Sequence, residues 1–526
     1  MAKKDESGRK VPVAKNDEIQ LTITDMSVNG EGIGRTGGYA LFVKDAMPGD
    51  DILAKVIKVK KTYGYARLMK ILVPSKDRVE PPCPVARQCG GCQIMHCSYE
   101  SQLRWKESKV ADCLRRIGNV RVLTKQEWEN AQNEEEAARK GLSGQGKHGE
   151  SKNLPEKGED ASLAAMKDME GDNTTILMEE IIGMEEPWHY RNKAQFPVGR
   201  DKEGNIVIGF YAGRTHNIVP QTDCLIQDAA APLILDCIKK WMQQENIMPY
   251  DEKSGKGVVR HVLLRSGFYT KEIMVCLVVN QDTVPASDIL VDMLSRLDLQ
   301  SCDRKLTGIC ASHNTKNTNV ILGKKISLLY GRDYIEDKIG DIIYQISVPS
   351  FYQVNPVQTE KLYETALEYA DLHGEETIWD LYCGIGTISL FLAKKAGKIY
   401  GVEIVPEAIE NAKNNARKNG IENAEFYVGA AEEILPDLYE KSGGNMKADV
   451  ITLDPPRKGC DPKLLDVIAA IAPSRIVYIS CDPATLARDV KKLGESGYQL
   501  ERVRCVDMFG QSGHVESVCL LHRRDS

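Results

Sequence analysis

The chain has 526 residues, more than the roughly 250 to 300 at which a single hydrophobic core stops growing, so several domains are expected. Hydrophobic residues make up 42% and charged residues 27%, which excludes a wholly disordered, collagenous or membrane-embedded chain. No apolar run reaches the ~18 residues of a membrane-spanning helix, and the charged N-terminus lacks the apolar stretch of a signal peptide. We therefore expect a cytoplasmic protein with mostly reduced cysteines and no membrane partner.

The formal net charge of -6 hides an uneven distribution along the chain. Residues 1–76 carry 14 Lys/Arg against 9 Asp/Glu, whereas residues 126–186 carry 6 against 16. A modestly basic body with a separable acidic segment is compatible with a polyanionic partner. An ordinary mixed-charge surface is the alternative.

Residues 14–72 alternate apolar and polar positions in short runs separated by glycines, a pattern typical of a small β-barrel. Cations and aromatic rings occur together near its last strands, as in proteins that follow a phosphate backbone and stack bases. These residues are Lys55, Lys58, Lys60, Lys61, Tyr63, Tyr65 and Arg67. The pattern predicts a nucleic-acid-binding barrel; an edge strand protected by lysines is the alternative.

Residues 119–184 are rich in glutamate, glycine and serine and contain few bulky apolar side chains. Such a composition buries too little surface to offset the entropy of ordering, which predicts a mobile acidic insertion, transiently helical around residues 127–140. The flanking segments, 77–118 and 185–335, are assigned together to a central α+β domain.

The C-terminal part, residues 336–526, is expected to be an α/β domain. From about residue 375, short β-rich apolar runs alternate with helical stretches, which predicts a doubly wound parallel sheet of the Rossmann-like kind. Ligands of such sheets bind beyond the carboxyl ends of the strands.

A Gly-x-Gly turn lies between a predicted strand and helix in DLYCGIGTISL, which begins at Asp380. Glu403 follows Asp380 by 23 residues, at the end of the next predicted strand, where an acid commonly holds the hydroxyls of a ribose. Ser389 occupies the position of a third glycine, so an adenosyl ligand without pyrophosphate, S-adenosylmethionine, fits better than a dinucleotide. A tight strand–helix turn without a ligand is the alternative.

Three further groups carry chemistry near the same crevice. Asp454, in LDPPRKG, follows an apolar strand, and the two prolines after it fix the loop. Cys481, in YISCDPATLARD, lies between a predicted strand and the N-terminus of a helix, a position that favours a thiolate. Glu516, in HVES, offers a possible base.

The spacing Cys83-x5-Cys89-x2-Cys92 indicates a metal site. Spacing alone does not distinguish zinc from an iron-sulfur cluster. It also leaves the fourth ligand open between Cys97 and Cys224.

Together with SFYQVN (350–355), these motifs resemble the bacterial RNA (uracil-5-)-methyltransferases, and among them the 23S ribosomal RNA members that carry an N-terminal TRAM domain and a [4Fe-4S] cluster. The segment YRNKAQFPVG (190–199) also matches this family. The resemblance implies that Cys481 is the nucleophile and Glu516 the proton acceptor. The S-adenosylmethionine contacts that it implies are Gln353, Tyr382, Glu403 and Asp454. The cluster ligands that it implies are Cys83, Cys89, Cys92 and Cys224, with Cys97 as a packing residue.

The implied function is S-adenosylmethionine-dependent formation of 5-methyluridine in 23S rRNA, at an unpaired uridine and by a monomer. The same reaction on tRNA is a close alternative. A cytosine-5 RNA methyltransferase is disfavoured because Ser480, rather than the Pro or Thr usual there, precedes Cys481. A noncatalytic iron-sulfur protein that binds RNA is the alternative from another class.

Overall fold

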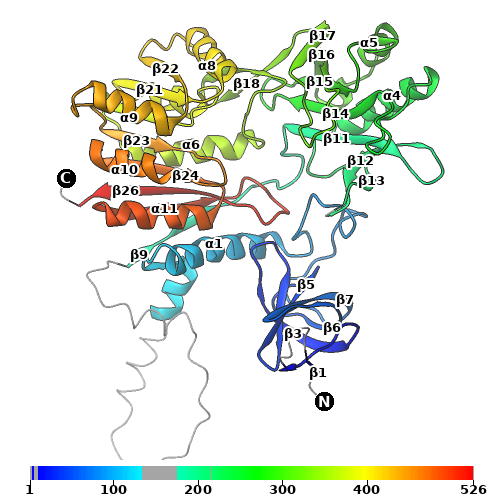
Figure 1. Ribbon diagram of the computed structural model, residues 1–526, viewed down its shortest axis with the longest axis horizontal. Helices are drawn as coiled ribbons and strands as arrows, with labels where there is room; N and C mark the ends of the chain where they lie inside the picture. The colour runs from blue at the N-terminus through cyan, green and yellow to red at the C-terminus, as the bar shows by residue number, and fades with distance from the viewer. Residues whose placement is uncertain (1–2, 5–9, 133–174, 214, 525–526) are drawn as a thin grey trace, which may run out of the picture.

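The computed structural model describes residues 3–4, 10–132, 175–213 and 215–524. The described residues form an N-terminal barrel, a central sheet and a C-terminal α/β sheet, together with small two-stranded sheets (Figure 1). Helix α1 (Tyr99–Arg116) begins near the barrel and runs beneath the C-terminal sheet (Figure 1). No helix in the described ranges is long and apolar enough to cross a membrane.

The N-terminal sheet closes into a barrel with strand order β3-β4-β5-β7-β6. Alternate residues of each strand point inward, as the sequence pattern requires, and Leu41, Val43 and Ile52 are fully buried. Gly32 is required because a Cβ there would lie 2.6 Å from the carbonyl oxygen of Ala46. The strands, with the short pair that precedes them, are β1 (Lys3–Lys4), β2 (Lys10–Val11), β3 (Glu18–Met26), β4 (Gly32–Thr36), β5 (Tyr39–Lys44), β6 (Asp51–Val59) and β7 (Tyr63–Val73).

The central sheet has the strand order β13-β12-β11-β14-β15-β16-β17. One face packs on helices α4 and α5 around Phe196 and Trp241, and the other face joins the core of the C-terminal domain through residues such as Leu263. The elements are β11 (Lys193–Arg200), β12 (Ile206–Tyr211), β13 (Ile218–Pro220), α4 (Ala231–Gln244), β14 (Val259–Ser266), β15 (Glu272–Val279), α5 (Ser287–Ser295), the 3-10 helix Gln300–Cys302, β16 (Lys305–His313) and β17 (Lys325–Gly331).

The C-terminal sheet has the strand order β10-β25-β26-β24-β23-β20-β21-β22. Its strands are β10 (Glu179–Ile182), β20 (Thr377–Leu381), β21 (Lys398–Glu403), β22 (Ala424–Val428), β23 (Val450–Leu453), β24 (Arg475–Ser480), β25 (Tyr498–Val506) and β26 (Glu516–Arg523). Its helices are α6 (Pro356–Ala370), α7 (Thr387–Ala393), α8 (Pro406–Lys418), α9 (Ala431–Lys441), α10 (Pro462–Ile471) and α11 (Pro483–Glu495).

The predicted parallel arrangement is confirmed for β20 to β24, whereas β26, beyond the runs from which it was predicted, is antiparallel to both β24 and β25. The connection from β25 to β26, residues 507–515, explains the difference. A parallel pair needs a crossover of about a dozen residues or more, usually with a helix, and this connection is shorter.

The structured region extends further into the predicted insertion, 119–184, than composition suggested. β8 (Val122–Leu123) pairs in parallel with β9 (Ile176–Leu177), residues 125–132 are helical, and β10 joins the C-terminal sheet beside β25. The buried side chains of Ile176 and Met178 explain this order, because a short apolar run at the end of the segment contributes to the core. Residues 133–174 lie outside the described residues.

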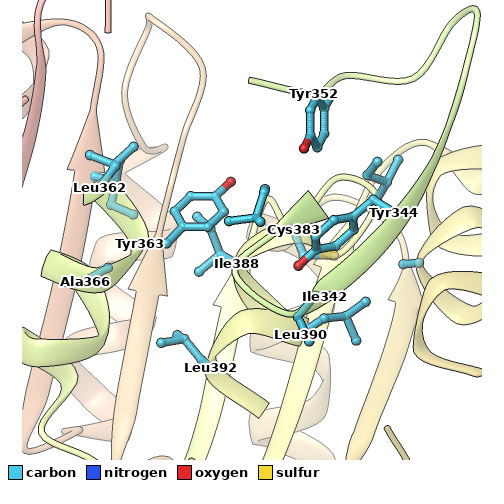
Figure 2. Close-up of a cluster of buried hydrophobic side chains, with 14 of the residues drawn as sticks. Ile342, Tyr344, Tyr352, Leu362, Tyr363, Ala366, Cys383, Ile388, Leu390 and Leu392 are labelled. Carbon is cyan, nitrogen blue, oxygen red and sulfur yellow. The ribbon is translucent and has the colours of Figure 1, made fainter. Parts of the chain in front are cut away.

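The expected boundary between residues 335 and 336 falls inside β18 (Tyr334–Ile339), which pairs with β19 (Ile342–Ser347). Figure 2 shows Tyr344 of β19 and Tyr363 of α6 lying around the start of α7. The Tyr344 hydroxyl donates to the carbonyl oxygen of Thr387 at 2.9 Å, and the Tyr363 hydroxyl lies 2.8 Å from Thr387 Oγ1. The hairpin therefore helps to fix the helix that follows the glycine turn.

Candidate active site

The Gly-x-Gly turn lies at the carboxyl end of β20, beside Glu403 at the end of β21. Gly384 and Gly386 have positive φ values of 56° and 81°, which favour glycine. The Gly384 amide donates to Glu403 Oε2 at 3.2 Å, and the Val405 amide donates to Glu403 Oε1 at 2.9 Å. The turn and the predicted ribose-binding acid therefore form one surface at the end of the sheet.

Asp380, directly before this surface, is fully buried. Its carboxylate accepts hydrogen bonds from the Ser389 hydroxyl and, at 3.1 Å, from Thr452 Oγ1. Burial raises the pKa of Asp380 to about 6. These bonds join β20, α7 and β23. The hydrogen bond from Ser389 to Asp380 was not predicted from the sequence, although the two residues lie nine positions apart within one motif.

Two other predicted cofactor contacts, Gln353 and Tyr382, lie before α6 and directly after β20. Gln353 is buried, and its carbonyl oxygen accepts a hydrogen bond from Asn192 Nδ2 at 2.8 Å, which links the loop before α6 to the central domain. Tyr382 has a φ of 72°, a conformation disfavoured for a side chain of this size, and its ring packs beside Cys460. Tyr352 packs in the core near Tyr344, whereas Phe351 is 68% exposed.

Cys481 and Glu516 come from neighbouring antiparallel strands. Ser480 at the end of β24 pairs with Ser517 of β26, which brings Cys481, directly after β24, near Glu516 at the start of β26, and the charge of Glu516 acts on the Cys481 thiol. Cys481 is half-buried, and Glu516 is 3% exposed. Glu516 Oε2 is buried and has no hydrogen-bond partner among the described residues.

The electrostatics correct the expectation that Cys481 is a ready thiolate. Burial, followed by the carboxylates of Glu516 and Asp454, raises the pKa of the Cys481 thiol to about 11. These effects outweigh the helix terminus that follows, where the Asp482 side chain already accepts from two main-chain amides. Arg457 acts in the opposite direction and lowers the pKa of Cys481. The effect of Arg457 was not predicted from the sequence, although this residue directly follows the two prolines after Asp454.

Asp454 and Glu516 form a pair of acids that influence each other. Burial, and then the charge of Asp380, raises the pKa of Asp454 to about 7. Burial, and then the charge of Asp454, raises the pKa of Glu516 well above its ordinary value. Two acids in such a site lose their protons in two steps that belong to the pair rather than to either acid.

Replacing Arg457 by glutamine should raise the pKa of Cys481, because a positive charge that favours the thiolate is lost. A rise of about half a pKa unit lowers the thiolate fraction about threefold below the pKa. Alkylation of Cys481 by iodoacetamide, measured against pH, should become slower by this factor. Lys458→Gln, an exposed neighbour, is the control. An unchanged alkylation profile in Arg457→Gln would contradict the assigned electrostatics.

Four cysteines line a second pocket, between the segment after the barrel and the central sheet. They are Cys83, Cys89, Cys92 and Cys224. Burial, and then the charges of the other three thiols, raises the pKa of Cys92 to about 12, as expected for thiols that lie close together. The Gly90 amide donates to the carbonyl oxygen of Tyr211 at 3.1 Å, which holds this segment against β12. Cys97 instead packs with Met26, Met47 and Ile94.

Within the described residues, no group of three His, Cys, Asp or Glu side chains is arranged to hold a single metal ion. Thiols that bind different irons of a cluster lie further apart than thiols that share one ion, so this finding concerns single-ion sites. The donor set, four cysteines on one pocket, fits a [4Fe-4S] cluster.

The barrel carries a group of three aromatic rings on β5 and β7. The ring centroids of Phe42, Tyr63 and Tyr65 lie 5.5 to 5.7 Å apart. Tyr63 is 36% exposed, and Lys58, Lys60 and Lys61 lie on or beside the adjacent strand. Phe42 extends the cation and aromatic surface that the sequence predicted.

The C-terminal sheet, with its glycine turn and the Asp-Pro-Pro loop that begins at Asp454, has the fold of a methyltransferase. Comparisons with known proteins identify the family. A family model described as tRNA (Uracil-5-)-methyltransferase matches residues 286–524, and a TRAM domain model matches residues 12–69. An uncharacterized RNA methyltransferase of Clostridium tetani is 43% identical over 511 residues, which cover 97% of this chain and 97% of the relative. One of Halalkalibacterium halodurans is 43% identical over 519 residues, which cover 99% and 100%.

The chain therefore belongs to the S-adenosylmethionine-dependent RNA uracil-5-methyltransferases. Its fold is similar to that of a Pyrococcus abyssi tRNA (uracil-54, C5)-methyltransferase solved with S-adenosyl-L-homocysteine, with a TM-score of 0.69 at 24% identity over 95% of this chain and 99% of that chain. These findings confirm the predicted TRAM domain, the enzyme class and S-adenosylmethionine as the cofactor.

Proposed function

We propose that this enzyme forms 5-methyluridine in 23S rRNA, with Cys481 as nucleophile and Glu516 as proton acceptor. The observation that carries this assignment is the pairing of Ser480 with Ser517 between β24 and β26, which supports a site shared by Cys481 and Glu516, the residues next to that pair. The buried Glu516 Oε2, which has no hydrogen-bond partner among the described residues, supports it, because this oxygen is available to a substrate group or to water.

The chemistry accounts for both groups. C5 of uracil is too weak a nucleophile to take a methyl group directly, so the Cys481 thiolate adds to C6 and places electron density on C5. S-adenosylmethionine supplies the methyl group that C5 then takes. Glu516 removes the proton from C5, the C5–C6 double bond re-forms, and the C6–S bond breaks to return the Cys481 thiolate.

The acid pair supplies the required proton acceptor. The raised pKa values of Asp454 and Glu516 favour proton uptake by this pair, and Glu516 is the member assigned to remove the C5 proton. Glu403 would hold the ribose of the methyl donor, and Gln353, Tyr382 and Asp454 would line the rest of its site. An exposed Phe351 beside Gln353 is available to stack on the target base.

The choice between ribosomal and transfer RNA is a finer part of the proposal. The combination of TRAM barrel and four-cysteine pocket, which resembles the 23S branch, favours ribosomal RNA. The family description and the Pyrococcus abyssi enzyme favour transfer RNA as the second candidate. Mass mapping of both RNAs from a strain lacking the enzyme, before and after treatment with the purified protein, tests them. A 5-methyluridine restored only in tRNA would reject the ribosomal assignment.

The four-cysteine pocket is proposed to hold a [4Fe-4S] cluster. Cys83, Cys89 and Cys92 would provide three ligands and Cys224 the fourth, which would connect the segment after the barrel to the central domain. The reaction transfers no electrons, so the role assigned to the cluster is structural.

Protein purified without oxygen should be brown and contain iron and sulfide, because four converging thiolates stabilise such a cluster. Cys224→Ser should lose most of this iron. Cys97→Ala, which changes a thiol packed among Met26, Met47 and Ile94, should keep it. A colourless protein that contains zinc, or iron loss in Cys97→Ala alone, would contradict the assignment.

Tyr63→Ala should weaken RNA binding, because stacking of one base on an aromatic ring contributes about 1–3 kcal/mol. Binding of S-adenosylmethionine should be unchanged, since the barrel is separate from the glycine turn. Filter binding and calorimetry measure the two affinities, and Met69→Ala, another exposed residue of β7, is the control. An equal loss of both affinities would reject this division of roles.

A further inference from the structure

The connection between β25 and β26, residues 507–515, lies directly before Glu516. Val506 and Glu516 pair across the hairpin, so the conformation of this connection sets the position of Glu516. Four of the side chains that hold it come from α1, far away in the sequence, and the others are those of Gln93, Tyr190, Asn355 and Gln358. Figure 1 shows α1 running beneath this end of the C-terminal sheet.

Four residues of α1 contact the connection, and their spacing of three or four residues places them on one helical face. They are Tyr99, Gln102, Lys106 and Lys109. The Lys106 ammonium donates to Asp507 Oδ1 at 2.6 Å and to the carbonyl oxygen of Phe509 at 3.0 Å. The Tyr99 hydroxyl donates to Asp507 Oδ2 at 2.8 Å. The side chains of Lys106 and Asp507 are both 0% exposed.

Gln102 holds the connection at its most strained residue. Gln511 has a φ of 67°, which is uncommon for a residue other than glycine. Its main-chain amide donates to Gln102 Oε1 at 3.0 Å, and Gln102 Nε2 donates to the Gln511 side-chain oxygen at 3.0 Å. Such a conformation persists where the surroundings fix it from several sides.

Lys109 extends the contact to the barrel. Its ammonium donates to the carbonyl oxygen of Gly513 at 2.8 Å and to that of Val28, in the turn after β3, at 3.2 Å. Cys481 and Asp454, in contrast, follow β24 and β23 and are positioned by the sheet itself. Among the three acid and thiol groups of the site, Glu516 is the one that directly follows a segment hydrogen-bonded by α1, although α1 also packs on α11, the helix after Cys481.

We propose that α1 positions Glu516 for removal of the C5 proton, with Lys106 and Gln102 as positioning residues. The inference rests on the proposed function, in which Glu516 is the proton acceptor. Neither residue touches the reacting atoms; both act through the backbone of residues 507–515.

A displaced Glu516 leaves the earlier steps possible and slows the last one. Cys481 still adds to C6 and C5 still takes the methyl group, but the C5 proton is removed slowly. RNA that is methylated and still bound to Cys481 should then accumulate. A purely structural role of α1 would instead lower all steps together.

The test uses the full-length enzyme and RNA carrying tritium at C5 of uridine, so that methyl transfer and tritium release are followed in the same single turnover. In Lys106→Met, methyl transfer should stay within about threefold of the wild type, while tritium release should slow at least tenfold. The double variant Lys106→Met/Asp507→Asn should give the same result. It contains no unpaired buried charge, so it replaces the single variant if that one fails to fold. Arg116→Gln, an exposed cation of α1, should match the wild type.

The inference is overturned if the folded variants release tritium in step with methyl transfer, whether both rates are normal or both are reduced. It is also overturned if neither Lys106 variant folds, because α1 then supports the whole fold rather than Glu516. Failure of the proposed function looks different: the wild type itself would form no 5-methyluridine or no adduct with Cys481.

Discussion

Cys481→Ala is expected to abolish 5-methyluridine formation, with a loss of at least ~10⁴-fold in single-turnover rate. Without a thiolate at C6, C5 retains the weak nucleophilicity of free uracil, and no other group described near the site replaces this addition. The rate is measured as transfer of a labelled methyl group to an RNA with an unpaired uridine. Substantial transfer in Cys481→Ala would show that methylation proceeds without this nucleophile.

Two controls separate this chemical loss from damage to the fold. S-adenosylmethionine affinity should be unchanged, since Cys481 follows β24 and the glycine turn follows β20. Cys302→Ala, which alters another half-buried thiol remote in sequence from the site, should retain the wild-type rate.

Glu516→Gln should turn over about 10²- to 10⁴-fold more slowly, because an amide cannot accept the C5 proton. The substitution keeps the size of a buried side chain. Methylated RNA should therefore remain attached to Cys481 and appear as a complex that withstands denaturing electrophoresis. Loss of one carboxylate should also lower the pKa of Cys481, since the charge of Glu516 raises it.

Glu501→Gln, at an exposed position of β25 that pairs with His522, is the matched control and should behave as the wild type. Normal turnover of Glu516→Gln without a trapped complex would assign proton removal to another group. Asp454 would then be the candidate, because it belongs to the same acid pair.

The sequence predicted the local parts of the site well. The glycine turn, the acid at the end of the next strand and the cysteine before a helix each lie within a short segment, where strand and helix patterns determine the geometry. The pairing of Ser480 with Ser517 is different, because residues far apart in sequence meet there and no local pattern determines their register. Cys481 and Glu516 were assigned to one site from the family resemblance and not from any periodicity in the sequence.

The predictions that failed also concern features that short sequence patterns do not determine. The helix terminus after Cys481 suggested a thiolate, but burial and two carboxylates from other strands raise its pKa. Averaged composition concealed the apolar run that forms β9 and β10 at the end of the predicted insertion. The contact between α1 and residues 507–515 joins positions about 400 apart, and no sequence motif predicts it. The iron-sulfur cluster and its ligands stay a prediction.

The most direct measurement uses RNA in which 5-fluorouridine replaces the target uridine. Fluorine at C5 cannot leave as a proton does, so the final elimination is blocked after the sulfur has bonded to C6. The account predicts a stable methylated complex, with mass spectrometry of the digested protein locating the nucleotide on the peptide that contains Cys481. Absence of the complex in active enzyme, or its attachment to another residue, would contradict the central claim.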